Sequence, residues 1–132
     1  MSAQATGTFK IEHWDEHPYQ ETDDGGKLTR ARVTQTFTGD IAGDGEVEWL
    51  MCYRPDNTAD FVGLQRIVGR IAGRSGSIVL ETRGTFDGTA AAGPLRIVAG
   101  SGTRELEGIS GDGELHAPLG GEASITLAYR FD

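Results

Sequence analysis

The sequence predicts an all-β domain, a closed eight-stranded antiparallel β-barrel, and three observations support this. No stretch keeps apolar residues at the period of about 3.6 that an amphipathic helix requires. Apolar and polar residues alternate instead, as in strands with one face on a core. Glycine accounts for 20 of the 132 residues. Without a fixed repeat, that much glycine indicates many tight turns.

The first four strands are expected at 7–14, 28–41, 46–54 and 59–71. Phe9 and Ile11 alternate with Lys10 and Glu12 in the first of them. The second and third continue the pattern, with inward positions at Ala31, Val33, Gln35, Phe37, Val47, Trp49, Met51 and Tyr53. Turn-forming residues at 24–26, 43–45 and 55–57 separate these runs,. The region 15–27 is expected to be the longest loop.

The last four strands are expected at 76–87, 90–99, 110–117 and 122–131. One segment, 101–109, does not alternate. Ser101 or Thr103 can cap a helical turn there, and Gly108 can end it, so one short helical turn is expected near 102–108. Eight strands can close into a barrel that holds side chains or one small ligand. The chain is expected to form a single domain over 1–132, with residues 1–6 frayed.

Composition limits the partners. The formal net charge is −8, which repels nucleic acid and anionic membranes,. The acidic stretch 12–24 is interpreted as a solvated loop. A single cysteine, Cys52, excludes an internal disulfide, and alternation places it outside as an inert thiol,. No leader or membrane-length apolar run is evident. We therefore expect a cytoplasmic protein that binds neither nucleic acid nor membrane.

Several inward-facing positions are polar. Alternation places His13, Gln35, Tyr53, Thr82 and Tyr129 inside the barrel,. Buried polar groups need hydrogen-bond partners. They form either a satisfied internal network or part of a ligand cavity, whose apolar walls would be Phe37, Trp49, Met51 and Phe86.

The phase of strand 59–71 is ambiguous. If Phe61 and Ile67 point inward, Gln65 does too, whereas inward Val62 and Val68 would bring Arg66 inside. Outside the barrel, Arg30, Arg32 and Arg83 are expected to pair with Glu12, Glu46, Glu48 or Glu81.

Motifs for known chemistry are largely absent. The chain has no complete nucleophile elbow, phosphate-binding loop or dinucleotide fingerprint. His13 and His17, with Asp15 and Glu16 between them, are the histidine-based candidate for a metal site. Side chains four apart on a strand lie about 13 Å from each other, too far to share one ion unless the chain has already turned before Pro18. We expect no metal and no cofactor.

Four segments carry a family resemblance: 28–34, 37–41, 73–80 and 100–108. Together they resemble a bacterial domain-of-unknown-function family that is similar in fold to allene oxide cyclase. The Gly100–Gly108 segment also resembles a glycine-rich stretch of allene oxide cyclases and dirigent proteins, with Arg104 in place of glycine and Leu106 in place of phenylalanine. The resemblance implies an eight-stranded barrel with a central cavity, a fold used by isomerases of epoxides and by polyene cyclases.

Two functions follow as hypotheses. The first is a barrel that binds a small apolar molecule, and that acts, if it is an enzyme, as a cyclase or isomerase. Trp49 would then be a wall, Gln35, Gln65 and Thr82 would orient the ligand, and proton transfer would fall to His13, Tyr53 and Tyr129. The second is a non-catalytic barrel with a filled interior, which forms homo-oligomers through an outer apolar patch around Trp14, Leu50 and Leu95.

Overall fold

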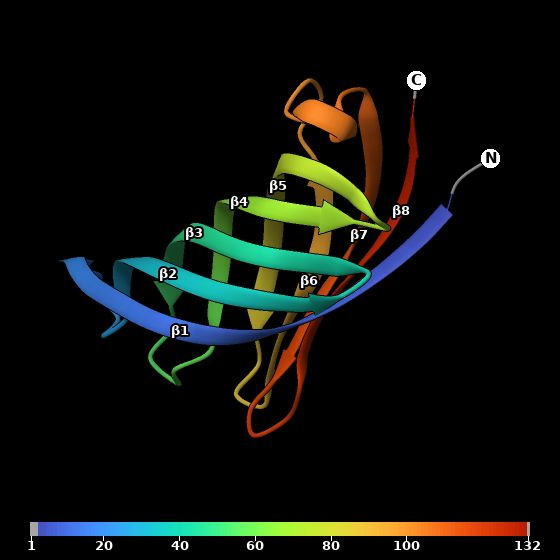
Figure 1. Cartoon of the computed structure of the whole chain (residues 1–132). Coiled ribbons are helices and arrows are strands. Elements are labelled where there is room, and N and C mark those ends of the chain that lie inside the picture. Colours follow the sequence, from blue (N-terminus) through green and yellow to red (C-terminus); the bar gives the residue numbers. More distant parts are fainter. Residues whose placement is uncertain (1–2, 132) are drawn as a thin grey trace.

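The computed structural model describes residues 3–131, and they form a closed antiparallel barrel in which each strand pairs with the next (Figure 1). The strands are β1 (Ala3–Glu21), β2 (Lys27–Gly39), β3 (Ile41–Tyr53), β4 (Ala59–Ile71), β5 (Arg74–Phe86), β6 (Ala90–Ile97), β7 (Ile109–Pro118) and β8 (Ala123–Phe131). A 3-10 turn, η1 (Arg104–Leu106), lies between β6 and β7. The predicted fold class is confirmed.

The predicted helical turn is present as η1, although its cap differs from the expectation. Thr103 occupies the N-cap position but makes no capping bond. Its hydroxyl instead accepts the Ser77 backbone N–H at 2.9 Å and bonds the Ser77 hydroxyl at 2.7 Å. These bonds tie η1 to β5. Leu106, only 1% exposed, then covers this end of the barrel.

Both ends of β1 extend beyond the prediction. The expected loop 15–27 is strand as far as Glu21, because these residues continue the ladder with β2 and only a tight turn remains. The Asp24 carboxylate closes that turn by accepting from the Thr22 hydroxyl and the Gly26 N–H. Residues 3–6 are not frayed, since they pair with β8 and bury Ala5. Residues 1 and 2 lie outside the described range.

The start of β1, the end of β8 and η1 lie at one end of the barrel (Figure 1), and buried side chains fill this end. Its most buried members include Ile41, Ile71, Ile78, Leu106, Ile125 and Leu127, each at most 2% exposed. Burying such side chains contributes about 1.5–3 kcal/mol each before conformational entropy is counted. We call this the filled half, and it provides the main hydrophobic core.

The opposite end opens, because β1 leaves β8 while it stays paired with β2. The β1–β8 ladder runs only from Ala3 to Phe9, opposite Tyr129 to Ala123. The rest of β1 pairs with β2 alone, which leaves an edge that sweeps away from β8 in Figure 1. Two register shifts and Pro18 interrupt this edge, which discourages pairing with another strand,. Within residues 3–131, no helix has the length and apolar character needed to cross a membrane.

Candidate functional site

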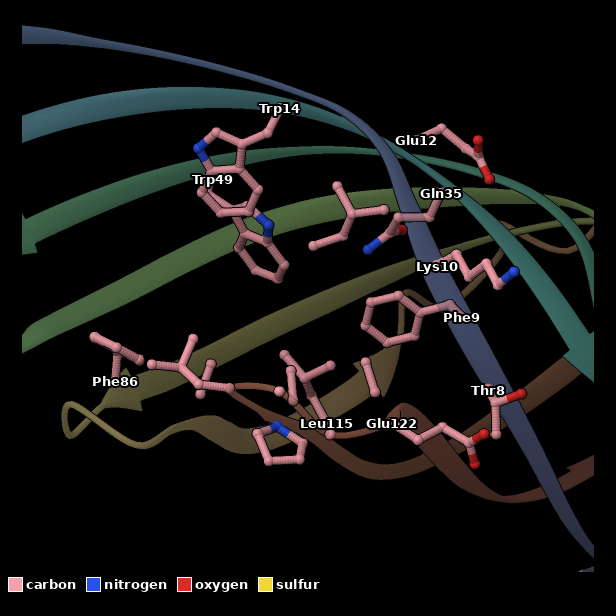
Figure 2. A pocket seen from close by; sticks show the side chains of 18 of the residues that line it. Thr8, Phe9, Lys10, Glu12, Trp14, Gln35, Trp49, Phe86, Leu115 and Glu122 are labelled. Atoms are coloured by element: carbon pink, nitrogen blue, oxygen red, sulfur yellow. The ribbon is translucent and has the colours of Figure 1, made fainter.

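A cavity of about 1160 Å³ occupies the open end of the barrel, which we call the hollow half. Figure 2 shows side chains from several strands converging on it. Its larger apolar walls are Phe9, Trp14, Trp49, Met51, Phe86 and Leu115. A volume of this size with mainly apolar walls is typical of small-molecule sites.

Trp49 is placed by the strand beside it. Gly63 of β4 pairs with Trp49 of β3, and a Cβ at Gly63 would lie 2.4 Å from the Trp49 ring. Glycine therefore leaves the space that the indole occupies. Phe61 then meets Trp49 edge to face, with ring centroids 5.0 Å apart,. The wall of the cavity is thus held by packing within β3 and β4.

Two glutamines resolve the phase of β4. Gln65 points inward and is 2% exposed, whereas Arg66 is exposed on the outer face. The Gln65 amide nitrogen donates to the Gln35 side-chain oxygen across the interior. Gln35, itself 4% exposed, also lines the cavity. The inward prediction is therefore confirmed for both glutamines, which meet at the floor of the hollow half.

The inward prediction for His13 is wrong. The β1–β2 register shifts between Ile11 and His13, which leaves Glu12 without a partner on β2. Such a bulge reverses the alternation of the residues that follow, here as far as the second register shift between Pro18 and Gln20,. His13 is exposed as a result, and Trp14 and Glu16 take the inner side in its place.

The Glu16 carboxylate organises the mouth of the cavity. It accepts the Trp14 indole N–H at 2.9 Å and the Thr29 hydroxyl at 2.7 Å. Partial burial alone would raise the pKa of Glu16, but hydrogen bonds from Thr29, Trp14 and Tyr53 outweigh burial and lower it,. Glu16 is therefore ionised at neutral pH, and it holds Trp14 at the rim.

Tyr53 shares this environment. Partial burial, the hydrogen bond to Glu16 and the charge of that carboxylate raise the pKa of Tyr53 to about 12. Its hydroxyl lies 3.7 Å from the Met51 sulfur, and both side chains line the cavity. At neutral pH the Tyr53 phenol is thus a hydrogen-bond donor and not a base.

The Glu16 network predicts a defined pH dependence. Its folded pKa lies below the ordinary value of 4.5, so its stabilisation is complete above that pH and is lost as the pH falls through the folded pKa,. Glu16→Gln keeps the shape but removes the charge, and should lower the free energy of unfolding by about 1 kcal/mol at pH 7. Urea titrations at pH 7 and pH 3 should show this difference shrinking. An unchanged difference at pH 3 would contradict the role given to the carboxylate.

The other predicted site residues fall into two groups, those that line the cavity and those that are buried beyond its lining. Trp49, Met51, Tyr53 and Phe86 line the cavity, as Gln35 does. Phe37, Gln65, Thr82 and Tyr129 are buried but lie outside the lining. Within residues 3–131, the Thr82 hydroxyl is among the buried polar atoms that have no hydrogen-bond partner. The predicted catalytic set of His13, Tyr53 and Tyr129 is therefore not brought together at the cavity.

The predicted outer patch also differs from the structure. Leu95 faces inward and is 3% exposed, and Trp14 lines the cavity, so only Leu50 lies on the outer sheet surface as expected. Beside Leu50, the exposed apolar residues of β4 are Val62, Leu64 and Val68. Cys52 is free and exposed, in agreement with the prediction.

Charged side chains are distributed over the outer surface. The guanidinium groups of Arg30 and Arg32 lie 4.0 and 3.7 Å from the Glu48 carboxylate. Glu48 is one of the cross-strand partners that the sequence predicted. His17 lies 2.8 Å from Asp15 on the exposed part of β1. Over residues 3–131, no three His, Cys, Asp or Glu side chains gather closely enough to share a metal ion.

Comparison with known proteins identifies the family. Residues 5–129 match the family model described as "Protein of unknown function (DUF3224)". The chain belongs to the DUF3224 family. A similar solved structure is that of a DUF3224 protein of unknown function from Shewanella oneidensis MR-1. It is 24% identical, with a TM-score of 0.78, over 100% of this chain and 99% of that one. This likeness establishes the fold that the two proteins share, and the comparison with curated proteins gives no match.

The lining residues Phe9, Trp14 and Leu115 were not among the site residues predicted from the sequence, and Glu16 and Thr29, which are bonded beside Trp14, were missed as well. Thr29 lies two residues before Ala31, so the alternation of β2 already indicated that it faces inward,. Glu16 lies beyond the bulge within an acidic stretch, where alternation from Phe9 assigns the wrong face. The sequence of β1 does not reveal that Glu16 faces inward, because the bulge that turns it inward is visible only in the pairing of β1 with β2.

Proposed function

We propose that this DUF3224 protein binds a small, neutral, mainly apolar organic molecule in the hollow half of the barrel. The observation that carries the proposal is the cavity of about 1160 Å³ walled by aromatic and aliphatic side chains. Apolar walls of this extent favour a ligand whose apolar surface they can remove from water. The filled half supports the site, because its packing fixes the strands whose other ends form the walls.

The charges around the cavity favour a neutral ligand. Lys10, Glu12 and Glu122 are the charged residues in its lining, and all three are exposed. An anionic group inside would lose its hydration without gaining a buried cation as partner. The ionised Glu16 near the mouth and the formal net charge of −8 add repulsion,.

A cyclase or isomerase activity is the finer form of this proposal. The resemblance to allene oxide cyclases suggests it, and an apolar cavity promotes such reactions by holding one reactive conformer away from water. Of the three residues predicted to move protons, Tyr53 is the one that lines the cavity. Its neutral hydroxyl would act there as a hydrogen-bond donor. We therefore propose ligand binding as the function, and a catalytic activity would require that binding.

The two tryptophans of the chain provide the test, because both Trp14 and Trp49 line the cavity. Intrinsic fluorescence therefore responds when a ligand occupies this site. We expect the neutral probe N-phenyl-1-naphthylamine to quench tryptophan emission saturably. Its anionic analogue 8-anilinonaphthalene-1-sulfonate, with the same rings and an added sulfonate, should bind at least tenfold more weakly.

The outcomes separate the two parts of the proposal. Saturable quenching by the neutral probe at equimolar stoichiometry supports a binding cavity. Equal affinity for the anionic analogue would overturn the preference for neutral ligands. Absence of saturable binding by either probe would count against the binding function itself.

A further inference from the structure

An unpaired amide donor faces the cavity from β2. Gln35 is only 4% exposed. Its side-chain oxygen already accepts a hydrogen bond from the Gln65 amide nitrogen. Within residues 3–131, no group accepts a hydrogen bond from the Gln35 Nε2. Figure 2 shows this nitrogen directed into the space between Trp49 and Phe9. A donor is thus presented to whatever occupies the cavity.

The neighbours of Gln35 fix the orientation of this amide. Gly45 pairs with Gln35, and a Cβ at Gly45 would lie 2.9 Å from the Gln35 oxygen. The oxygen is therefore held against β3, beside the donating Gln65, and the nitrogen lies at the opposite edge of the amide group.

The Trp49 indole adds a second donor to the same walls. Its N–H can donate but not accept, and it has no hydrogen-bond partner among the described residues. Trp49 is 6% exposed and lines the cavity. The Tyr53 hydroxyl at the rim is already engaged, because its one hydrogen is directed to the Met51 sulfur and the Glu16 carboxylate. Among residues 3–131, the free polar groups on the inner walls are therefore two donors, the Gln35 amide and the Trp49 indole.

We infer that the ligand bears a hydrogen-bond acceptor, a carbonyl or ether oxygen, at its inner end, and that the Gln35 amide N–H binds this oxygen. The inference rests on the proposed function and specifies its ligand class. The Gln35 Nε2 borders the cavity and is not among the sealed polar atoms that lack a partner. A ligand in the cavity would cover this donor, so a ligand that supplies an acceptor gains a hydrogen bond that an apolar ligand would leave unmade. A pure hydrocarbon of the same shape would leave the amide unpaired.

Two ligands of nearly equal shape test the inference on the full chain. 2-Acetylnaphthalene has a ketone oxygen at the position where 2-isopropylnaphthalene has a second methyl group. Isothermal titration calorimetry should show the ketone binding about tenfold more tightly to the unmodified protein. In Gln35→Met, which has a similar length but no donor, the preference for the ketone should be lost and the hydrocarbon should bind at least as tightly, because the ketone oxygen would be buried without a partner. Thr34→Val is the matched control, because it removes a hydroxyl from the neighbouring residue of β2 outside the cavity lining, and it should keep the preference.

A measurement on the unmodified protein remains informative if Gln35→Met does not fold. The carbonyl stretch of bound 2-acetylnaphthalene, isolated with a carbon-13 label, should shift to lower wavenumber than in hexane. An unshifted stretch, or equal affinity for the two ligands, would overturn the acceptor inference while binding itself stands. If neither ligand binds, the proposed function fails, and the inference fails with it.

Discussion

Replacing Phe37 by alanine is expected to lower the free energy of unfolding by about 3–5 kcal/mol. The ring is 1% exposed and packs against Phe9, with centroids 5.1 Å apart. It also lies over Gly45, where a Cβ would come within 2.7 Å of it. Neighbouring strands are fixed by the barrel ladder and cannot collapse into the space, so the cavity penalty adds to the lost burial.

Phe86→Ala provides the comparison in the hollow half. Phe86 is only half-buried and already borders the open cavity, so its removal creates little new empty space. We expect a loss less than half of that for Phe37→Ala, measured by urea denaturation of both variants. Equal losses would mean that the two halves are packed alike, contrary to the division proposed here.

Two indole rings placed in the cavity should abolish most of its binding. Ala91 of β6 and Ala117 of β7 are cross-strand neighbours, and both line the cavity. In Ala91→Trp/Ala117→Trp, we estimate that the rings deny the ligand about 100 Å² of apolar contact. At about 25 cal/mol per Å², this corresponds to about 2.5 kcal/mol, or roughly sixtyfold weaker binding of N-phenyl-1-naphthylamine.

A matched control lies on the outer face of the same two strands. Ala92 and His116 also pair across β6 and β7, and neither lines the cavity. Ala92→Trp/His116→Trp adds the same rings outside the barrel and should leave the affinity within about twofold of the unmodified protein. Probe fluorescence gives both affinities. Similar weakening by the two double variants would show that the probe does not bind inside the barrel.

Much of the fold could be predicted because its signals are local. The strand 59–71 has the predicted bounds, since turn-forming residues flank a regular alternation. The same alternation correctly placed Gln35, Trp49 and Met51 inside. In these strands the inward or outward direction depends only on the position of a residue in an uninterrupted run.

The rest of the site depends on features that alternation does not encode. His13 was misplaced because one unpaired residue, Glu12, reverses the faces of β1. Tyr129 and Thr82 do point inward, but alternation does not give the height of a residue along the barrel axis. That height follows from the stagger of the strands. Both residues are consequently buried but lie outside the cavity lining.

The most direct test of a ligand-binding hollow half is the mapping of amide chemical shifts in a nitrogen-15-labelled protein titrated with N-phenyl-1-naphthylamine. The account predicts saturable shifts of the Trp14 and Trp49 indole signals and of the Gln35 side-chain amide, with little change at Ile71 or Leu106 in the filled half. Shifts confined to the outer surface around Leu50 and Leu64, or no saturable shift at all, would contradict it.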